Sequence, residues 1–243
     1  SLRNRPLKQF KLSSEFIYYY VKGKCKPNGF SFSIAGPDGS GKTTILNELH
    51  SILSAVYRET TLNHFRPTII PRLAEVFKKS GLKREVDENY SEPHRGGKTG
   101  VLSSIVRLFY YIIDYVVGYN KIIKPVLFRR GVVIFDRYFT DIISDSKRSR
   151  ININFKFIFF FRKFVPKLNY NFIIFVKPDI ILQRKQELTK EQINSIYKKL
   201  NYVCDNDSRY KRIENNTKPD VAINEIIDFI LKNQDNKYAS YFI

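Results

Sequence analysis

One short stretch restricts what this chain can fold into more than any other. Residues 36–44 read Gly-Pro-Asp-Gly-Ser-Gly-Lys-Thr-Thr, a pattern in which a glycine-rich loop turns its backbone N–H groups toward nucleotide phosphates. Residues 30–35 alternate like a short strand, and residues 43–53 carry apolar side chains at helical spacing. A strand, a glycine turn and a helix N-terminus form an anion site, because the helix dipole favours negative charge there. The alternative is a glycine-rich turn without a ligand.

The composition is that of a basic protein of moderate size. With 243 residues, of which 43% are hydrophobic, the chain suits one α/β domain with additions. Forty-two Lys and Arg against 23 Asp and Glu give a net charge of +19, which favours anionic partners. Compositional drift toward lysine would give the same charge. Because we find no recognised nucleic-acid-binding motif, no nucleic acid partner is expected.

Cysteine usage and hydropathy indicate where the protein works. The two cysteines have no metal-binding spacing, as expected in a reducing cytoplasm. No uncharged apolar run approaches the ~18 residues that span a bilayer, since Arg107 and Asp114 interrupt the longest candidate. Residues 155–161 are a run of aromatics flanked by basic residues. This run is interpreted as a core helix or subunit contact, or as a peripheral membrane contact.

The order of segments predicts an α/β fold. Strands are expected at residues 30–35, 60–65, 132–135, 172–176 and 210–213, and helices at residues 43–53, 71–79, 101–128 and 219–231. Strands that alternate with helices indicate a parallel sheet covered on both faces. Residues 1–28 are predicted to be an N-terminal helical extension, residues 80–100 a polar loop, and residues 29–243 the main domain.

A basic segment near the C-terminus has the pattern of a lid. Pro178 is a favoured first residue of a helix, while Thr189 and Gln192 have the spacing of a capping box that starts a second helix at residue 190. The two pieces would hinge near Glu187, with Arg184 just before the break. A hinged basic segment over a phosphate site suits a lid, which we place at about residues 178–203.

A second motif separates the classes of phosphate-binding proteins. Residues 132–136 form a hydrophobic strand that ends in Asp136, the element that normally faces the phosphate loop and orients magnesium. ATP-driven motors usually follow this carboxylate with Glu, whereas this chain has Arg137, a cation suited to a substrate phosphate. The guanine signature Asn-Lys-x-Asp is absent from the sequence. Group transfer to a small acceptor is therefore favoured over hydrolysis.

Taken in order, these segments resemble the thymidylate kinase family. The similarity covers about residues 29–231 and includes the phosphate loop, Phe65-Arg66-Pro67, Lys124-Pro125, Asp136-Arg137-Tyr138 and residues 178–184. It is greatest for the divergent branch associated with bacterial surface polysaccharide genes. The resemblance implies a P-loop NTPase fold with a five-stranded parallel sheet. It also implies transfer of the γ-phosphoryl group of ATP, with Mg²⁺, to a nucleoside monophosphate, and a homodimer.

The same resemblance assigns roles to individual residues. It implies that Lys42 bridges the β- and γ-phosphates, and that Thr43 and Asp136 bind magnesium. The nucleotide-binding residues would be Gly36, Gly39, Ser40, Gly41, Lys42, Thr43 and Thr44. The acceptor-binding residues would be Asp38, at a sugar hydroxyl, Arg66 and Arg137, at the phosphate, Phe109, against the base, and Tyr138. Arg184 would close over the transferring group, so the catalytic set is Lys42, Asp136, Arg137 and Arg184.

The chain departs from the family pattern on the acceptor side. Family members commonly carry Asp-Arg in the long helix, where this chain has Asp114-Tyr115, and the residues that help read thymine are replaced by Phe139-Thr140-Asp141. One alternative is therefore a kinase of the same fold that acts on a sugar or glycan-lipid intermediate. Another is a non-catalytic nucleotide-binding protein. Three structural interpretations also stay open: Arg66 forms a surface ion pair, Phe109 packs in the core, and Arg184 lies at a solvated helix end.

Overall fold

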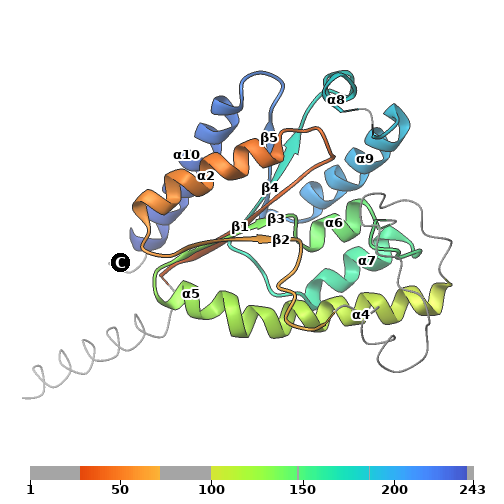
Figure 1. Ribbon diagram of the computed structural model, residues 1–243, viewed down its shortest axis with the longest axis horizontal. Helices are drawn as coiled ribbons and strands as arrows, with labels where there is room; N and C mark the ends of the chain where they lie inside the picture. Colours follow the sequence, from red (N-terminus) through yellow and green to blue (C-terminus); the bar gives the residue numbers. More distant parts are fainter. Residues whose placement is uncertain (1–27, 72–99, 147, 186, 240–243) are drawn as a thin grey trace, which may run out of the picture.

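The computed structural model describes residues 28–71, 100–146, 148–185 and 187–239. The N-terminal helix expected at residues 1–28, the helix expected at 71–79 and the loop expected at 80–100 lie almost entirely outside the described residues. The described part forms one α/β sheet structure with helices on both faces (Figure 1).

The centre of the molecule is a sheet of five parallel strands. Their order is β2 (Thr60–His64), β3 (Val132–Asp136), β1 (Phe30–Ala35), β4 (Tyr170–Phe175) and β5 (Tyr210–Glu214). Every residue of β1 is buried, which is typical of a parallel strand covered by helices on both faces. The predicted parallel sheet is therefore confirmed.

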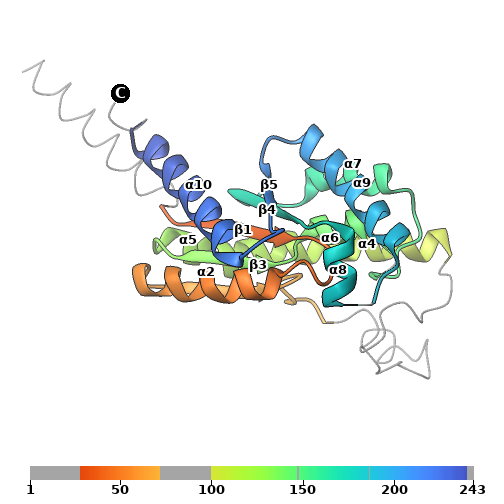
Figure 2. The same ribbon diagram turned by 90° about the horizontal axis from the view of Figure 1, so that it is seen from above.

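Two groups of helices cover the two faces. On one face, α2 (Lys42–Val56) and α10 (Pro219–Ala239) pack over the sheet. On the other, α4 (Val101–Gly118) and α5 (Lys124–Phe128) lie in one line, joined by a π-helical turn η2 (Tyr119–Ile123) (Figures 1 and 2). The short helices α6 (Phe139–Ser144) and α7 (Phe155–Phe161), followed by the 3₁₀ turn η3 (Arg162–Phe164), complete that face.

The line of helix from Val101 to Phe128 is long and apolar enough to cross a membrane, by length and composition alone. Its inner side packs in the core of the domain, with Leu108 and Tyr115 fully buried. Asp114 on the same helix is also fully buried and accepts hydrogen bonds from the loop after β2. These contacts make the helix a cover of the sheet.

The segment predicted to be a lid forms two helices. They are α8 (Pro178–Arg184) and α9 (Lys190–Asn206), and both halves of the predicted Thr189–Gln192 capping box are present. Ile181 of α8 and Leu200 of α9 are fully buried in the core. A movement of both helices would therefore expose apolar side chains of the core. The role as a lid stays a prediction.

Because the strands are parallel, their carboxyl ends meet at one edge of the sheet, where ligands bind in folds of this type. Ile34 of β1 and His64 of β2 are both register partners of Asp136 at the end of β3. The phosphate loop follows β1 at the same edge. The topology thus brings together the motifs that lie about 100 residues apart in the sequence.

Candidate active site

The phosphate loop connects β1 to α2 in the predicted strand–turn–helix arrangement. Gly39 and Gly41 both have φ of 85°, a left-handed conformation that favours glycine. The side-chain amide of Asn215, just after β5, donates to the carbonyl oxygen of Ser40 at 2.9 Å, and a β-carbon at Gly41 would lie 2.6 Å from that amide nitrogen. Asn215 therefore fixes the position of the loop at the N-terminus of α2, where backbone N–H groups lack helical partners.

Lys42 is the first residue of α2, and its ammonium group lies inside the loop. Its Nζ donates to the carbonyl oxygen of Pro37 at 2.6 Å and lies 3.7 Å from Oδ1 of Asp38. Only 5% of the residue is exposed, and burial, assisted by the charge of Arg137, lowers the pKa of Lys42 to about 8. A phosphate group reaching this ammonium would meet a cation that is little hydrated.

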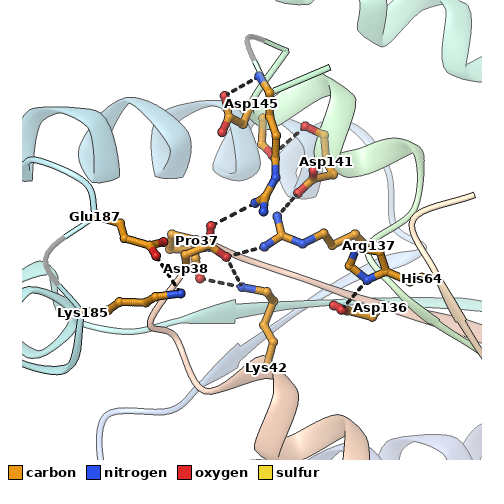
Figure 3. Close-up of polar contacts among 12 residues, drawn as sticks. Pro37, Asp38, Lys42, His64, Asp136, Arg137, Asp141, Asp145, Lys185 and Glu187 are labelled. Atoms are coloured by element: carbon orange, nitrogen blue, oxygen red, sulfur yellow. Dashed lines mark hydrogen bonds and ion pairs between the residues drawn. The ribbon is translucent and has the colours of Figure 1, made fainter. Parts of the chain in front are cut away.

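Arg137 turns from the end of β3 toward the loop. Its backbone is left-handed, with φ of 65°, and its N–H donates to the carbonyl oxygen of Ile34 at 3.0 Å. This conformation costs a non-glycine residue on the order of 1 kcal/mol, and such strain gathers at functional sites. The buried guanidinium pairs with Asp38 of the loop and with Asp141 of α6, the latter at 2.7 Å (Figure 3). Burial alone would lower the pKa of Arg137, but the two carboxylates raise it.

The carboxylate of Asp38 lies between the two predicted halves of the site. Oδ1 contacts Lys42 and Arg137, and Oδ2 accepts a hydrogen bond from Nη1 of Arg148 at 2.9 Å. Burial would raise the pKa of Asp38, but the charges of Arg137, Lys42 and Arg148 together lower it to about 2. Asp38 is therefore ionised at neutral pH and joins the donor-side lysine to the acceptor-side arginine.

Asp136 has one carboxylate oxygen that is available to a ligand. Oδ2 lies 2.8 Å from Nδ1 of His64, whereas the buried Oδ1 has no hydrogen-bond partner among the described residues (Figure 3). Although burial raises the pKa of Asp136, the His64 hydrogen bond and the charge of Arg137 lower it. A buried carboxylate oxygen without a partner fits a metal ion or its bound water. Thr43, at the start of α2, is exposed, so a ligand at the phosphate loop can reach its side chain.

Arg66 follows β2, and its side chain is bound by residues of the long helix α4. Its Nη1 donates to Oδ2 of Asp114 at 2.9 Å, and its guanidinium lies 5.2 Å from the centre of the Tyr111 ring. Asp114 also accepts hydrogen bonds from the backbone N–H groups of Thr68 and Ile70. Arg66 does form an ion pair, as one interpretation expected, but at 9% exposure the pair is buried and not at the surface.

Two predicted acceptor residues have other partners. Tyr138 is 3% exposed, donates to the carbonyl oxygen of Pro166 at 3.0 Å, and packs its ring 4.6 Å from that of Tyr115. Phe109 is 45% exposed, and its ring packs edge-on against Phe161 of α7 at 5.2 Å. The partners of both side chains therefore lie outside the phosphate loop. Their roles toward an acceptor stay predictions.

The basic end of α8 lies over the phosphate loop. A β-carbon at Gly41 would be 3.8 Å from Nη1 of Arg184, so this guanidinium lies close to the loop. Lys185 packs its stem near Gly39, and its Nζ pairs with Glu187 at 3.0 Å (Figure 3). The predicted lid cation thus lies beside the nucleotide-binding residues.

Three contributors to the site were not predicted from the sequence. Asp141 follows Arg137 by four residues, and this helical spacing is visible in the sequence. Arg148 and Asn215 reach Asp38 and Ser40 across 110 and 175 residues of chain, and no sequence spacing indicates these contacts.

Comparisons with known proteins give a fold and no sequence family. No protein-family model and no curated protein matches the chain. The solved thymidylate kinase of Ehrlichia chaffeensis is similar with a TM-score of 0.53 and 21% identity, over 83% of this chain and 98% of that chain. A thymidylate kinase structure from Candida albicans, whose published description concerns broad substrate specificity, is similar with a TM-score of 0.57 and 17% identity, over 85% of this chain and 92% of that chain.

At these identities the likeness concerns the fold. In this chain that fold consists of the five parallel strands in their observed order and the loop between β1 and α2 at the carboxyl edge of the sheet. Folds of this kind bind nucleotides generally. The protein has the α/β P-loop fold of thymidylate kinases, with a five-stranded parallel sheet.

Proposed function

We propose that the protein transfers the γ-phosphoryl group of ATP to a nucleoside monophosphate, with Mg²⁺. The observation that carries this proposal is the approach of Lys42 and Arg137 to the same carboxylate, that of Asp38. A lysine of the phosphate loop and an arginine after the strand carboxylate thus lie close together, within contact of one oxygen of the Asp38 carboxylate. Phosphoryl transfer depends on such positioning and charge more than on covalent chemistry.

On the donor side, the loop and the first turn of α2 would bind the phosphates of ATP. Lys42 would leave the Pro37 carbonyl for the β- and γ-phosphates, and Gly36, Gly39, Ser40, Gly41 and Thr44 would line the nucleotide. The hydroxyl of Thr43 and the unpartnered oxygen of Asp136 would hold Mg²⁺ or its water, which supplies charge neutralisation at the phosphates. Arg184 would approach the transferring group from α8.

On the acceptor side, Arg137 would bind the phosphate that attacks. Arg66 uses one of its guanidinium donors for Asp114 and would offer another to the same acceptor. Once freed from its cations, Asp38 would accept a hydrogen bond from a sugar hydroxyl. Phe109 and Tyr138 would have to rearrange before they could contact the acceptor, because Phe109 now packs against Phe161 and Tyr138 donates to the carbonyl oxygen of Pro166.

One observation favours a second candidate, a kinase of this fold that acts on a phosphorylated sugar or glycan-lipid intermediate. Phe139 and Thr140, which stand where the resembling family reads thymine, are buried, and the Thr140 hydroxyl donates to the hydroxyl of Tyr210 at 3.3 Å. Asp141 is engaged by Arg137. These three side chains are therefore occupied within the protein, which supports an acceptor other than thymidine monophosphate. The link to polysaccharide synthesis itself rests on the sequence resemblance alone.

A turnover panel tests the proposal. Purified protein with Mg²⁺ and γ-labelled ATP is offered thymidine, deoxyuridine and other nucleoside monophosphates, beside phosphorylated sugars, and the labelled product is separated and identified. Transfer to a nucleoside monophosphate is the expected result. Transfer to sugars only would favour the second candidate, and ATP binding without transfer to any acceptor would favour a non-catalytic nucleotide-binding protein.

A matched pair of lysine variants shows whether the turnover belongs to this site. Lys42→Ala is expected to remove transfer, by a factor of about 10³ or more, because the developing phosphate charge loses its cation. Lys121→Ala changes an exposed lysine of η2 and should leave the rate unchanged. Equal rates in the two variants would assign the activity to another site or to a contaminant.

A further inference from the structure

A basic residue that the proposed function leaves unused reaches into the site. Nη1 of Arg148 donates to Oδ2 of Asp38 at 2.9 Å, while the guanidinium of Arg137 pairs with Oδ1 of the same carboxylate. The two arginines therefore occupy the two oxygens of one anion, with Lys42 nearby at 3.7 Å. Among the described residues, Asp38 is the carboxylate that the structure pairs with Arg148.

The segment that carries Arg148 is anchored beside α6. Asp145, the C-cap of α6, accepts a hydrogen bond from the backbone N–H of Arg148 at 3.4 Å (Figure 3). The N–H of Ile151 donates to the carbonyl oxygen of Ser146 at 2.9 Å, and Ile151 is buried. The side chain of Arg148 is 31% exposed, so it is partly buried and still accessible to a ligand.

We propose that Arg148 and Arg137 together bind the phosphate group of the acceptor, and that the carboxylate of Asp38 occupies this position when no acceptor is bound. The inference rests on the proposed function and names the part of the acceptor that this site takes. Two guanidinium groups on two oxygens of one carboxylate provide the same charge-assisted hydrogen bonds that two phosphate oxygens accept.

The location of Tyr115 supports this assignment. Tyr115, which follows Asp114 in the long helix, is fully buried and donates to the carbonyl oxygen of Phe65 at 2.8 Å. That position contributes no cation. Arg148 supplies a second cation from a different element of the fold, on the same carboxylate as Arg137.

The replacement of the Asp38 carboxylate by a phosphate on the two arginines also selects for a phosphorylated acceptor. Asp38 is bound by both arginines in the free protein, so its carboxylate is not available to a sugar hydroxyl. A phosphate that takes over the arginines releases Asp38 for that hydroxyl, whereas the corresponding unphosphorylated nucleoside or sugar leaves the ion pairs in place. The site is therefore expected to bind a monophosphate and to discriminate against the same compound without its phosphate.

Calorimetric titration of the whole protein tests this inference. The probes are inorganic phosphate, thymidine monophosphate, thymidine and ATP with Mg²⁺. In Arg148→Gln, the dissociation constants of inorganic phosphate and the monophosphate are expected to rise about tenfold or more, because a charge-assisted hydrogen bond is lost. The constant for ATP with Mg²⁺ should change less than about threefold. Arg129→Gln, which alters an exposed arginine paired with Glu59, should leave all four unchanged.

Asp38→Asn supplies a test in the opposite direction. Without the carboxylate that occupies the two arginines, inorganic phosphate should bind about tenfold more tightly than to the unaltered protein. Circular dichroism melting of each variant establishes that it is folded.

The outcomes separate this inference from the proposed function. Phosphate binding that depends on Arg148, without any phosphoryl transfer, would leave the inference standing and reject the enzyme. Normal transfer with equal phosphate affinities in Arg148→Gln and the unaltered protein would reject the inference and leave the enzyme. A loss of ATP affinity in Arg148→Gln as large as the loss of phosphate affinity would also overturn it, because Arg148 would then serve the donor.

Discussion

At the scale of single residues, the site depends on a few charges that are held close together with little water. Lys42, Arg137 and Arg148 all contact Asp38. Lys42 lies four residues after Asp38, whereas the two arginines come from distant parts of the sequence. Burial makes the protonation of Lys42 and of Asp38 sensitive to what binds beside them. Two predictions follow from the pKa values of Lys42 and Asp38.

The first concerns the pH dependence of nucleotide binding. The pKa of Lys42 in the free protein is about 8, since burial lowers it, and a triphosphate binds the protonated form. The dissociation constant of ATP with Mg²⁺ is therefore expected to rise about tenfold between pH 7 and pH 9, with proton uptake on binding near pH 8. Calorimetry in buffers of different ionisation enthalpy measures both. In Lys42→Ala this pH dependence should disappear, whereas a flat profile in the unaltered protein would contradict the prediction.

The second concerns the stability that Asp38 contributes. Its folded pKa of about 2 lies below the unfolded value of 3.8, so the contribution is full above pH 4 and is lost as the pH falls toward 2. Asp38→Asn should reduce the free energy of unfolding by about 2 kcal/mol at pH 7 and by about half as much at pH 3. Urea denaturation at both pH values measures the difference. An equal loss of unfolding free energy at pH 7 and pH 3 would show that the carboxylate charge does not stabilise the fold. The control is Asp228→Asn, which changes an exposed carboxylate.

At the scale of elements, the site is built from strand ends and from side chains that reach across to them. The loop after β2 has its conformation fixed by Asp114 of α4, which accepts from Arg66, Thr68 and Ile70. That helix in turn covers the sheet. A change in the middle of α4 should therefore affect the far end of β2.

Removal of the Asp114 carboxylate tests this connection. Asp114→Ala would leave the buried Arg66 guanidinium without its ionic partner and two backbone N–H groups without theirs. The free energy of unfolding should fall by about 3–5 kcal/mol, as for other broken buried pairs. Asp228→Ala, on the exposed side of α10, should change it by less than about 0.5 kcal/mol. Similar small effects in both variants, by urea denaturation, would contradict the assigned role of Asp114.

The sequence predicted those elements whose patterns are local. The strand at residues 30–35 has the predicted bounds, and the Thr189 capping box is present because its two members lie three residues apart. The short helix α6 was not predicted, since residues 139–144 are buried on all sides and carry no amphipathic period. Helix α10 continues to Ala239, beyond the predicted end at residue 231.

The site was predictable to the extent that its residues belong to motifs. The loop residues and the strand carboxylate were expected to meet, and Lys42 and Arg137 do share a carboxylate. The buried pairing of Arg66 with Asp114 was not expected, because a contact across 48 residues depends on how α4 packs on the sheet. Arg148 was missed for the same reason, since its position depends on the turn after α6.

At the scale of the whole molecule, a basic aromatic surface remains exposed. The α7 patch, which we define as Phe157, Phe160 and Phe164, has exposures of 41%, 50% and 57%. Lys163 lies over the Phe160 ring at 4.8 Å, and Lys156 is exposed beside it. Aromatic rings interleaved with lysines, on a protein with a net charge of +19, suit a peripheral contact with an acidic membrane surface.

Vesicle sedimentation tests this contact. The protein should sediment with vesicles that contain acidic phospholipid, less with neutral vesicles, and less at high salt. Phe160→Ser combined with Phe164→Ser should reduce binding at least fivefold, because two apolar anchors are removed. Leu231→Ser, at an exposed apolar residue of α10, is the control. If neither vesicle type sediments the protein and the double variant instead converts a dimer to a monomer, the patch is a subunit contact.

The most direct test of the central claim is the affinity of one molecule that carries both proposed ligands, an adenosine and a second nucleoside joined by five phosphates. Calorimetric titration in the presence of Mg²⁺ should show that it binds at least tenfold more tightly than ATP. Lys42→Ala and Arg137→Gln should each remove that advantage, because both cations contact the same Asp38 carboxylate and, in the proposed function, serve the two ends of one phosphate chain. Undiminished affinity in Arg137→Gln, with the loss confined to Lys42→Ala, would contradict a shared site for donor and acceptor.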